Sequence, residues 1–473
     1  MNKLSLLTPN LQKYGDHPLY LQLFLFIKNE IETEKLLEDT RLPSIRNLAD
    51  YLCLSRNTVD LAYQLLIQED FIRSVKGSGF FVNKVHEHKK FSQGSIPSLN
   101  NPPIRYDLYH KAVDYNEFPY TTWNQIAKTN SLLSGSDDTH VMDPKGEIYL
   151  RKEIVKYLYS TRGLHCTPDQ IVIGTSSTQL LQILLTLTNP MPHGDTVVYF
   201  EDPGYDVVRN FFIHQGFEIK PIRIEADGLC IEDLKMHQSN AFLYTSPSQQ
   251  VPLGSIMSLS KRQALMKWAE QNQVYVIEDD YDCTFIYEHS PIPALQSFDQ
   301  NEKVIYFGGF FRILCPEILC SYMVLPPHLL IKYNLTVATY SMPGISIHLQ
   351  KQLYTFMSEG NLYKHTKKMK MIYQQKHKRI NKLIEQHFGP AVNVIDTGAG
   401  THLILELLTK GIEEEDELVR LAISSGIYII STKKYRYRYI PENPQFLLHY
   451  GGLQMEELEG AIVLLKNVWS IEY

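Results

Sequence analysis

The chain has 473 residues and a mass of 54.7 kDa, which is enough for two or three domains of roughly 150 residues each. Its composition, with 44% apolar and 21% charged residues, allows large buried cores and excludes a disordered chain. The formal net charge of -6 is mild for this mass, so any contact with nucleic acid requires a local basic surface.

The six cysteines are scattered, without a CxxC pair or a histidine at metal-ligand spacing. This pattern predicts reduced thiols and no metal site. The first twenty residues lack the apolar core of a signal peptide, and the sequence contains no uncharged apolar run of about 18 residues. We therefore expect a cytoplasmic protein without a membrane partner.

Residues 16–83 contain three apolar stretches at helical spacing. Ser44 and Ser55 precede the second and third stretches, and we expect each serine to cap the helix that follows. Only residues 53–55 separate these two helices, which is typical of a helix-turn-helix. Two short strands at 71–75 and 80–82 enclose a glycine-containing turn and would form a wing.

The second helix of such a motif presents its N-terminal side chains to the major groove of DNA. Here those side chains are Arg56, Asn57 and Thr58. The segment LPSIRNLADYLCLSRNTVDLAYQLL, followed by GSGFFV, resembles the winged helix-turn-helix of GntR-type bacterial regulators. The resemblance implies double-stranded operator DNA as the partner. The predicted contact set is Arg46, Ser55, Arg56, Asn57, Thr58, Lys76 and Gly79. The alternative is a small domain that packs on another surface.

Residues 84–105 mix His, Lys, Ser, Asn and Pro without apolar periodicity. This composition predicts a solvated linker. Contact of its basic pair, Lys89 and Lys90, with the DNA backbone is the alternative role.

In residues 106–473, short apolar runs alternate with helical stretches, which predicts a mostly parallel sheet covered on both faces. The expected strands include 170–173, 196–200, 274–277 and 304–307. Ligand sites in such sheets lie beyond the carboxyl ends of the strands. The segments that follow these four strands read GTSSTQ, EDPGY, EDDYD and GGFFR.

These segments, together with MDPKGEIYLRKEIVKYLYSTRGL, SPSQQVPLGSIM and GAGTHLILEL, resemble the α/β fold-type I aminotransferases of class I and II. Behind a GntR-like head, they resemble the MocR subfamily of transcriptional regulators, especially its GabR-like members. The implied fold is a winged helix-turn-helix (α+β), a linker and an aminotransferase-like domain over 106–473. The large subdomain would span about 135–345 and the small one about 346–473. The resemblance also implies a homodimer.

Pyridoxal phosphate is the cofactor that the resemblance implies. At matching positions, Asp279 would hold the pyridine nitrogen, Tyr281 would bind the ring hydroxyl and Tyr205 would stack on the ring. The phosphate would lie on the turn after the first strand, at Ser176, Ser177 and Thr178.

The family pattern breaks at the lysine that forms the imine with this cofactor, because the chain has Arg312 there. A guanidinium, with a pKa above about 12, supplies no neutral amine near pH 7, so covalent binding at this position is excluded. Other positions of the site also depart from the pattern: Phe311, Ile313, Leu319, Val207, Gly452 and Gln249. Noncovalent binding would be weak, since each lost charge-assisted bond to the phosphate is worth about 1.5 to 3 kcal/mol.

We therefore predict a transcriptional regulator with no catalytic residues, whose aminotransferase-like domain serves dimerisation and senses a small anionic effector. One alternative is a regulator that senses pyridoxal phosphate or an amino acid noncovalently. The other is an active aminotransferase with a DNA-binding head, which would need a different lysine. Lys145 and Lys303 are poorly placed for that purpose.

Three site residues have structural alternatives. Asp279 and Tyr281 could be packing and capping residues at a strand end, and Arg312 could pair with Asp279 instead of binding an anion. Late in the chain, residues 433–438 interleave basic and aromatic side chains (KKYRYR). They are interpreted as a solvated part of the small subdomain, with binding of nucleic acid or an acidic partner as the alternative.

Overall fold

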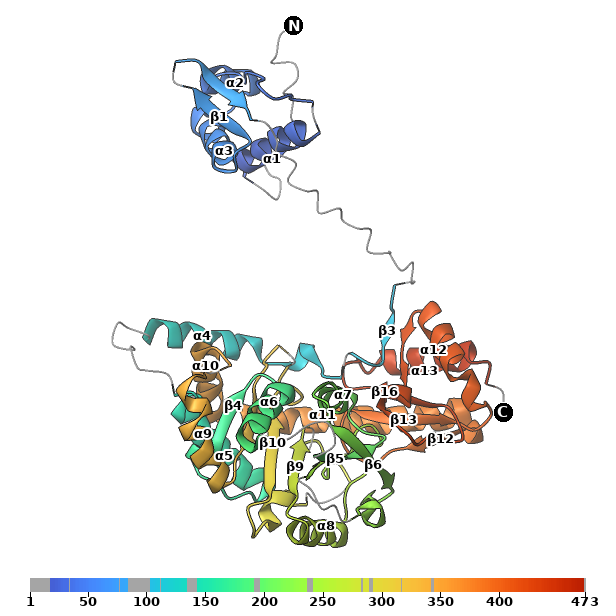
Figure 1. The fold of residues 1–473 in the computed structure, drawn as a ribbon. Helices are drawn as coiled ribbons and strands as arrows, with labels where there is room; N and C mark the ends of the chain where they lie inside the picture. The colour runs from blue at the N-terminus through green and yellow to red at the C-terminus, as the bar shows by residue number, and fades with distance from the viewer. Residues whose placement is uncertain are drawn as a thin grey trace. The chain divides into compact units, whose positions relative to one another are not determined.

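The computed structural model describes residues 18–33, 35–75, 77–83, 103–110, 112–133, 143–190, 196–235, 241–281, 284–288, 292–315, 317–341 and 344–471. The chain divides into two compact units, residues 1–100 and 101–473 (Figure 1). Residues 84–102 of the predicted linker, and Lys76, lie outside the described residues. No helix in the described ranges is long and apolar enough to span a membrane.

The first unit consists of three helices and a hairpin: α1 (Leu19–Glu32), α2 (Ile45–Leu52), α3 (Arg56–Gln68), β1 (Ile72–Val75) and β2 (Gly79–Val82). The helices surround the fully buried Tyr63, whose hydroxyl donates to the carbonyl of Pro43 at 2.9 Å. The Ser44 and Ser55 side chains accept hydrogen bonds from backbone N–H groups in the first turns of α2 and α3. The two predicted caps are therefore confirmed. The antiparallel pairing of β1 with β2 confirms the predicted wing.

The large subdomain of the second unit contains an eight-stranded sheet in the order β4-β11-β10-β9-β8-β5-β6-β7. The strands are β4 (Ile171–Gly174), β5 (Val197–Asp202), β6 (Glu218–Glu225), β7 (Gly228–Leu229), β8 (Ala241–Thr245), β9 (Tyr275–Asp280), β10 (Val304–Gly309) and β11 (Ser321–Val324). The central strands β10, β9, β8, β5 and β6 pair in parallel, whereas β11 and β7 run antiparallel to their neighbours. The predicted, mostly parallel sheet is confirmed.

Both faces of this sheet are covered, because the strands are apolar on both sides. Along β5, Val198 and Phe200 pack in one core cluster, and Val197 and Tyr199 pack in another. This alternation follows from the two-residue period of a strand. The covering helices include α5 (Ile148–Arg162), α6 (Ser177–Thr188), α7 (Asp206–His214), α8 (Leu259–Gln271) and α9 (Pro327–Leu335).

Three strands reach further than the sequence predicted. β5, β9 and β10 continue to Asp202, Asp280 and Gly309, so the EDD run at 278–280 belongs to a strand and not to the loop after it. The pairing of Gly308 with Asp280 shows that the parallel ladder extends through this run. Each of these carboxylates can be buried because it accepts hydrogen bonds from a specific partner, as described below.

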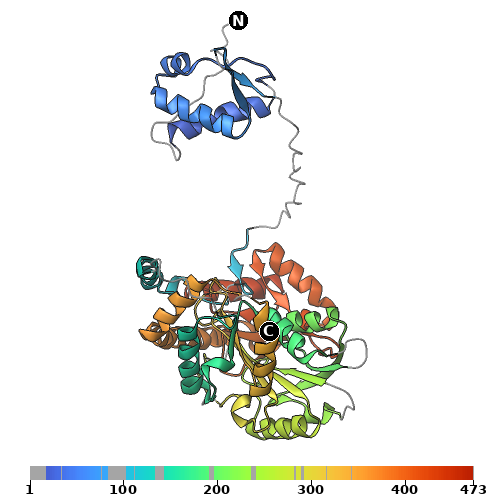
Figure 2. The same cartoon turned by 60° about the vertical axis from the view of Figure 1, so that its left-hand side comes forward.

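The small subdomain contains the sheet β12-β13-β16-β15, formed by β12 (Val392–Ile395), β13 (His402–Leu407), β16 (Gln445–His449) and β15 (Ile430–Ser431). The helices α11 (Asn361–Phe388), α12 (Glu415–Ser424) and α13 (Glu457–Val468) pack on its core. These elements, coloured orange to red, gather on one side of the second unit (Figure 2). Two further helices, α4 (Tyr120–Leu133) and α10 (Ile347–Ser358), pack against each other.

The segment that follows the predicted linker is part of the small subdomain. Its short strand β3 (Tyr106–Asp107) pairs in parallel with β14 (Ile427–Tyr428). Tyr106 and Leu108 are buried in the same core as α11 and α13. The chain therefore enters the second unit along the small subdomain (Figure 1).

Candidate functional site

The start of α3 carries the predicted recognition residues. The Arg56 and Asn57 side chains are exposed in the first turn of the helix. The Ser55 hydroxyl accepts from the Thr58 backbone N–H at 3.1 Å and lies 2.8 Å from the Thr58 hydroxyl. Ser55 and Thr58 therefore fix the start of the helix, which leaves Arg56 and Asn57 as its projecting groups.

The neighbouring elements add basic groups to this face. The Arg46 side chain on α2 is 74% exposed, and its nearest carboxylate is Asp50 at 4.0 Å. In the wing, Gly79 has a φ of +108°, which favours glycine. A Cβ added at Gly79 would lie 3.5 Å from Nε of Arg41, so the exposed Arg41 belongs beside the wing. The predicted contact set omitted Arg41, because only the folded structure shows that Arg41 lies beside the wing.

A pocket of about 310 Å³ lies beyond the carboxyl ends of the parallel strands in the second unit. It brings together five of the predicted cofactor residues: Ser177, Tyr205, Asp279, Tyr281 and Arg312. The predicted residues Ser176 and Thr178 do not line it. Its other walls come from segments far apart in the sequence, including Tyr109, His110, Ala112 and Val113 and the strands β13 and β16. We refer to it below as the strand-end pocket.

Successive side chains of a strand point to opposite faces of the sheet. Asp279 therefore lines this pocket, whereas the neighbouring carboxylates of Glu278 and Asp280 do not. Glu278 accepts the backbone N–H groups of Leu295 and Gln296 at 2.6 and 2.8 Å. Asp280 accepts from the guanidinium of Arg162 at 2.5 Å. Asp279 accepts from the Tyr244 hydroxyl on the adjacent strand β8, and burial raises the pKa of Asp279 to about 6.

The Arg312 guanidinium lies beside two aromatic rings, 6.0 Å from the centroid of Tyr281 and 5.8 Å from that of Phe311. Its Nε is buried without a hydrogen-bond partner among the described residues. Within the same residues no ion pair joins Arg312 to Asp279, so the alternative of a structural pair between them is not realised. Tyr244 holds the carboxylate in its place.

Two histidines that the sequence did not single out stand opposite each other on β13 and β16. The ring centroids of His402 and His449 are 5.2 Å apart, and both residues are over nine-tenths buried. Nε2 of His402 lies 3.0 Å from the carbonyl of Pro252, so it donates there and Nδ1 is the unprotonated nitrogen. Burial and the charge of Arg312 lower the pKa of His402 to about 4. The same two causes lower the pKa of His449.

The turn expected to hold a phosphate contains several hydrogen bonds of its own. The Gln179 side-chain oxygen accepts from the Thr175 backbone N–H at 2.7 Å and from the Thr175 hydroxyl at 2.9 Å. The Ser176 hydroxyl accepts from the Gln179 backbone N–H and lies 3.0 Å from that of Thr178. Within the described residues these bonds leave the backbone N–H groups of Ser176, Ser177 and Thr178 without an acceptor.

Next to this turn, Ser177 and Phe311 border a second cavity of only about 10 Å³. A cavity of this size has room for about one water molecule. Leu319, at the position of the family's arginine, is 56% exposed and offers no charge. The charged group that the family uses to hold the phosphate of pyridoxal phosphate is therefore missing at this position.

The lysines considered in the sequence lie away from the strand-end pocket. Lys145 approaches Asp169 at 3.4 Å, and Lys303 donates to the Gln273 side chain at 2.8 Å. Lys434 does line the pocket. Its ammonium donates to the Tyr109 hydroxyl and lies 3.8 Å from Asp206. The sequence missed Lys434 because only the docking of residues 432–438 brings it to the strand ends.

Residues 433–438 are largely exposed, as expected for a solvated stretch, but several of their groups bind other parts of the chain. Asp202 accepts from the backbone N–H groups of Tyr437 and Arg438 at 2.8 and 2.6 Å. The Arg436 side chain is only 8% exposed and forms a two-point ion pair with Glu415 at 2.7 and 3.0 Å. The Arg436 charge is therefore used within the small subdomain, and the backbone of Tyr437 and Arg438 contacts the large one.

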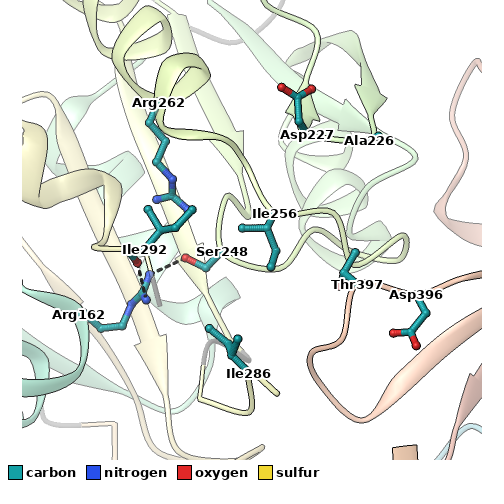
Figure 3. A pocket seen from close by; sticks show the side chains of 10 residues that line it. All are labelled: Arg162, Ala226, Asp227, Ser248, Ile256, Arg262, Ile286, Ile292, Asp396 and Thr397. Carbon is teal, nitrogen blue, oxygen red and sulfur yellow. Dashed lines mark hydrogen bonds between the residues drawn. The ribbon is translucent and has the colours of Figure 1, made fainter. Parts of the chain in front are cut away.

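A second pocket of about 440 Å³ contains none of the predicted site residues (Figure 3). Its buried arginine Arg162 binds Ser248, the Ile292 carbonyl and Asp280. Arg262 donates to three backbone carbonyls, those of Met257, Pro293 and Pro247. Because these charged groups already have internal partners, we do not assign a ligand to this pocket.

The structure also gathers Glu225, Cys230 and Glu232, whose potential ligand atoms lie within 4.8 Å of one another. The Glu225 carboxylate accepts from the Lys261 ammonium, and the Cys230 thiol donates to Glu232 at 3.3 Å. Both glutamates are exposed. These interactions account for the cluster without a metal ion.

Residues 19–82 match the family of bacterial regulatory proteins named gntR, and residues 113–447 match the family of class I and II aminotransferases. The chain is 35% identical to the HTH-type transcriptional regulator YhdI of Bacillus subtilis, over 98% of each chain. It is 28% identical to the probable rhizopine catabolism regulatory protein MocR of Rhizobium meliloti, over 97% of this chain and 95% of that one. It is also 28% identical to the pyridoxine biosynthesis transcriptional regulator PdxR of Corynebacterium glutamicum, over 83% of each chain.

Among solved structures, the chain is similar to the kynurenine aminotransferase of Pyrococcus horikoshii. The TM-score is 0.68 at 20% identity, over 79% of this chain and 92% of that one. An archaeal alanine:glyoxylate aminotransferase gives a TM-score of 0.69 at 22% identity, with the same coverage. At these identities the likeness shows the fold, and it confirms the predicted aminotransferase-like architecture.

Proposed function

This chain belongs to the GntR-type transcriptional regulators that carry a class I and II aminotransferase domain, and from that membership we propose that the domain senses a ligand and dimerises without catalysing transamination. Operator DNA would bind the first unit. The predicted DNA contacts, with Arg41 added, are Arg46, Ser55, Arg56, Asn57, Thr58, Lys76 and Gly79.

The observation that carries the loss of catalysis is Arg312 in the strand-end pocket. Pyridoxal phosphate is the cofactor of the aminotransferase family, and its use begins with an amine that attacks the aldehyde. A guanidinium is protonated at every physiological pH and is a poor nucleophile. Leu319, at the position of the family's phosphate-binding arginine, supports the same conclusion, since it offers no charge to the phosphate.

A dimer fits the DNA-binding role. Helix-turn-helix proteins bind two half-sites about one helical turn of DNA apart when two copies of the motif are joined by a symmetric interface. The aminotransferase-like domain is the larger unit, residues 101–473, and is our candidate for that interface. Protein of the expected dimer mass in sedimentation experiments would support this assignment, and a monomer that binds a full operator tightly would contradict it.

One experiment separates the inactive regulator from an active enzyme. The purified protein is incubated with pyridoxal phosphate, its visible spectrum is recorded, and borohydride is added before peptide mass mapping. We expect no imine band and no reduced adduct on any lysine. A stoichiometric adduct on Lys434, the lysine in the pocket, would favour the enzyme instead.

Noncovalent sensing of pyridoxal phosphate is the second candidate, favoured by the presence of Asp279, Tyr281 and Tyr205 in one pocket. The relative PdxR is named for pyridoxine biosynthesis. This candidate predicts saturable binding of the cofactor without an adduct in the same experiment, together with a change in operator affinity.

A further inference from the structure

Several buried polar atoms around the strand-end pocket have no hydrogen-bond partner among the described residues. They are Oδ1 of Asp206, Nε of Arg312, Nδ1 of His402 and Nδ1 of His449. Buried polar groups in native proteins are nearly always paired. Four unpaired atoms in residues that line one cavity therefore indicate a site that is completed by a ligand.

The group that would face Arg312 is an anion. Its guanidinium lies between aromatic rings and has no carboxylate partner within the described part of the chain. A planar guanidinium matches the geometry of a carboxylate, with which it forms charge-assisted hydrogen bonds. A phosphate is disfavoured, because Leu319 offers no charge where the family has an arginine and the small cavity beside Ser177 measures only about 10 Å³.

The group that would face His402 is a hydrogen-bond donor. The Pro252 carbonyl fixes the proton on Nε2, so Nδ1 can only accept. Oδ1 of Asp206 is a second unpaired acceptor on the wall of the same pocket. The ligand must therefore combine an acceptor at one end with a hydroxyl or amine at another.

The walls of the pocket determine the shape of the ligand. Tyr109, Tyr205, Tyr281 and Phe311 line it together with the two imidazoles. Such surfaces stack favourably on a flat ring. The volume of about 310 Å³ is at the lower end of the range for small-molecule sites, which suits a single ring with short substituents.

We infer that the strand-end pocket binds a small aromatic carboxylate that carries a ring hydroxyl or amine, with the carboxylate on Arg312 and the donor on His402. The inference rests on the proposed function in one respect, that no covalent cofactor fills the pocket. The ligand would touch Tyr109, His110 and Val113, which belong to the segment that follows the linker. A ligand bound in the pocket would therefore contact the part of the chain that leads to the DNA-binding unit.

The test is calorimetry on the full-length protein with 4-hydroxybenzoate as the probe. Benzoate lacks the donor and 4-hydroxybenzyl alcohol lacks the carboxylate, so each should bind about tenfold more weakly or worse. Arg312→Gln should weaken binding of 4-hydroxybenzoate by at least about tenfold, whereas Arg312→Lys, which keeps the charge but not the planar fork, should lose less. His402→Phe should abolish the difference between 4-hydroxybenzoate and benzoate. Lys332→Gln, on the exposed surface of α9, is the matched control and should bind as the unmodified protein does.

Three results would overturn the inference. The first is the absence of saturable binding of 4-hydroxybenzoate, the second is equal binding by Arg312→Gln, and the third is tighter binding of inorganic phosphate than of 4-hydroxybenzoate. If one variant fails to fold, the comparison of the three probes on the unmodified protein still decides. Operator binding and the absence of a borohydride adduct are measured on the same preparation, so failure of the proposed function is recognised separately.

Discussion

The ammonium of Lys434 donates a hydrogen bond to the Tyr109 hydroxyl and lies 4.6 Å from the centroid of the Tyr109 ring. The two residues are 325 positions apart, and both line the strand-end pocket. Tyr109 belongs to the segment that joins the predicted linker to the small subdomain, whereas Lys434 follows β15. The segment leading from the DNA-binding unit is thus one wall of the pocket.

The same segment is anchored by a buried ion pair, which gives the first prediction. Asp114 and Lys376 are each 3% exposed, and their charged atoms are 2.7 Å apart. Asp114→Asn should destabilise the second unit by about 3 to 5 kcal/mol, because it leaves the Lys376 charge buried without its counter-ion. Thermal unfolding measures the loss. Hydrogen exchange should also accelerate in residues 103–118.

Glu117→Gln provides the matched control in the same segment. Its partner Lys368 is 54% exposed, and the pair is held at 2.6 Å on the surface. Such exposed pairs contribute about 0 to 1 kcal/mol. Equal losses of stability in Asp114→Asn and Glu117→Gln would show that Asp114 does not anchor the segment.

The second prediction concerns Arg56 at the exposed start of α3. If its side chain reads a base edge, Arg56→Ala should weaken operator binding by about 1 to 3 kcal/mol and reduce discrimination against unrelated DNA. Band-shift titrations at a fixed salt concentration measure both effects. Lys28→Ala is the control, because Lys28 is engaged with Glu69 at 2.7 Å. Unchanged operator affinity in Arg56→Ala would remove Arg56 from the contact set.

The features that the sequence predicted correctly are local ones. Ser44 and Ser55 could be recognised as caps because a cap depends on three or four neighbouring residues. The strand β5 could be recognised because a strand covered on both faces is apolar without interruption. The predicted strands end before the observed ones. A carboxylate such as Asp279 can be buried in a strand only because Tyr244 on another strand donates a hydrogen bond to it, and the local sequence does not show this partner.

The features that the sequence did not predict depend on distant pairings. His402 and His449 are 47 positions apart in the chain, yet they stand opposite each other in the register of β13 and β16. Nothing in either local sequence indicates that both rings will line one pocket. Arg41 meets Gly79 only because the wing folds back onto the start of α2. The sequence also did not decide whether Arg312 pairs with Asp279, because the position of the Asp279 carboxylate depends on Tyr244.

The third prediction is that Arg312→Lys does not restore the aminotransferase cofactor site. The substitution supplies the missing amine, but Leu319 still offers no charge to the phosphate and Phe311 still borders the small cavity. At micromolar pyridoxal phosphate we expect no imine band beyond that of the unmodified protein. Absorption spectroscopy followed by borohydride reduction and mass mapping measures the outcome. A stable, reducible imine at position 312 would show that the phosphate site has survived.

The fourth prediction uses the buried imidazole of His402. Burial and the Arg312 charge lower its pKa in the folded protein to about 4, from an ordinary value of 6.5. Between these two pH values the unfolded chain binds a proton that the folded protein does not bind. The contribution of His402 to stability is therefore complete above about pH 6.5 and is lost as the pH falls towards 4, by roughly 3 kcal/mol in total.

His402→Gln removes this titration while keeping a donor for the Pro252 carbonyl. The stability of the variant relative to the unmodified protein should therefore improve by about 2 kcal/mol when the pH is lowered from about 7.5 to 5. Asp279, with its raised pKa, contributes a pH dependence of the opposite sign, but it is present in both proteins and cancels in the comparison. Chemical denaturation at each pH measures the difference. Asn210→Gln, at an exposed position of α7, changes no titratable group and should show a constant difference from the unmodified protein over this range. If the His402→Gln difference is equally constant, His402 is not held neutral in the folded state, and Nδ1 is not available to accept a hydrogen bond from a ligand.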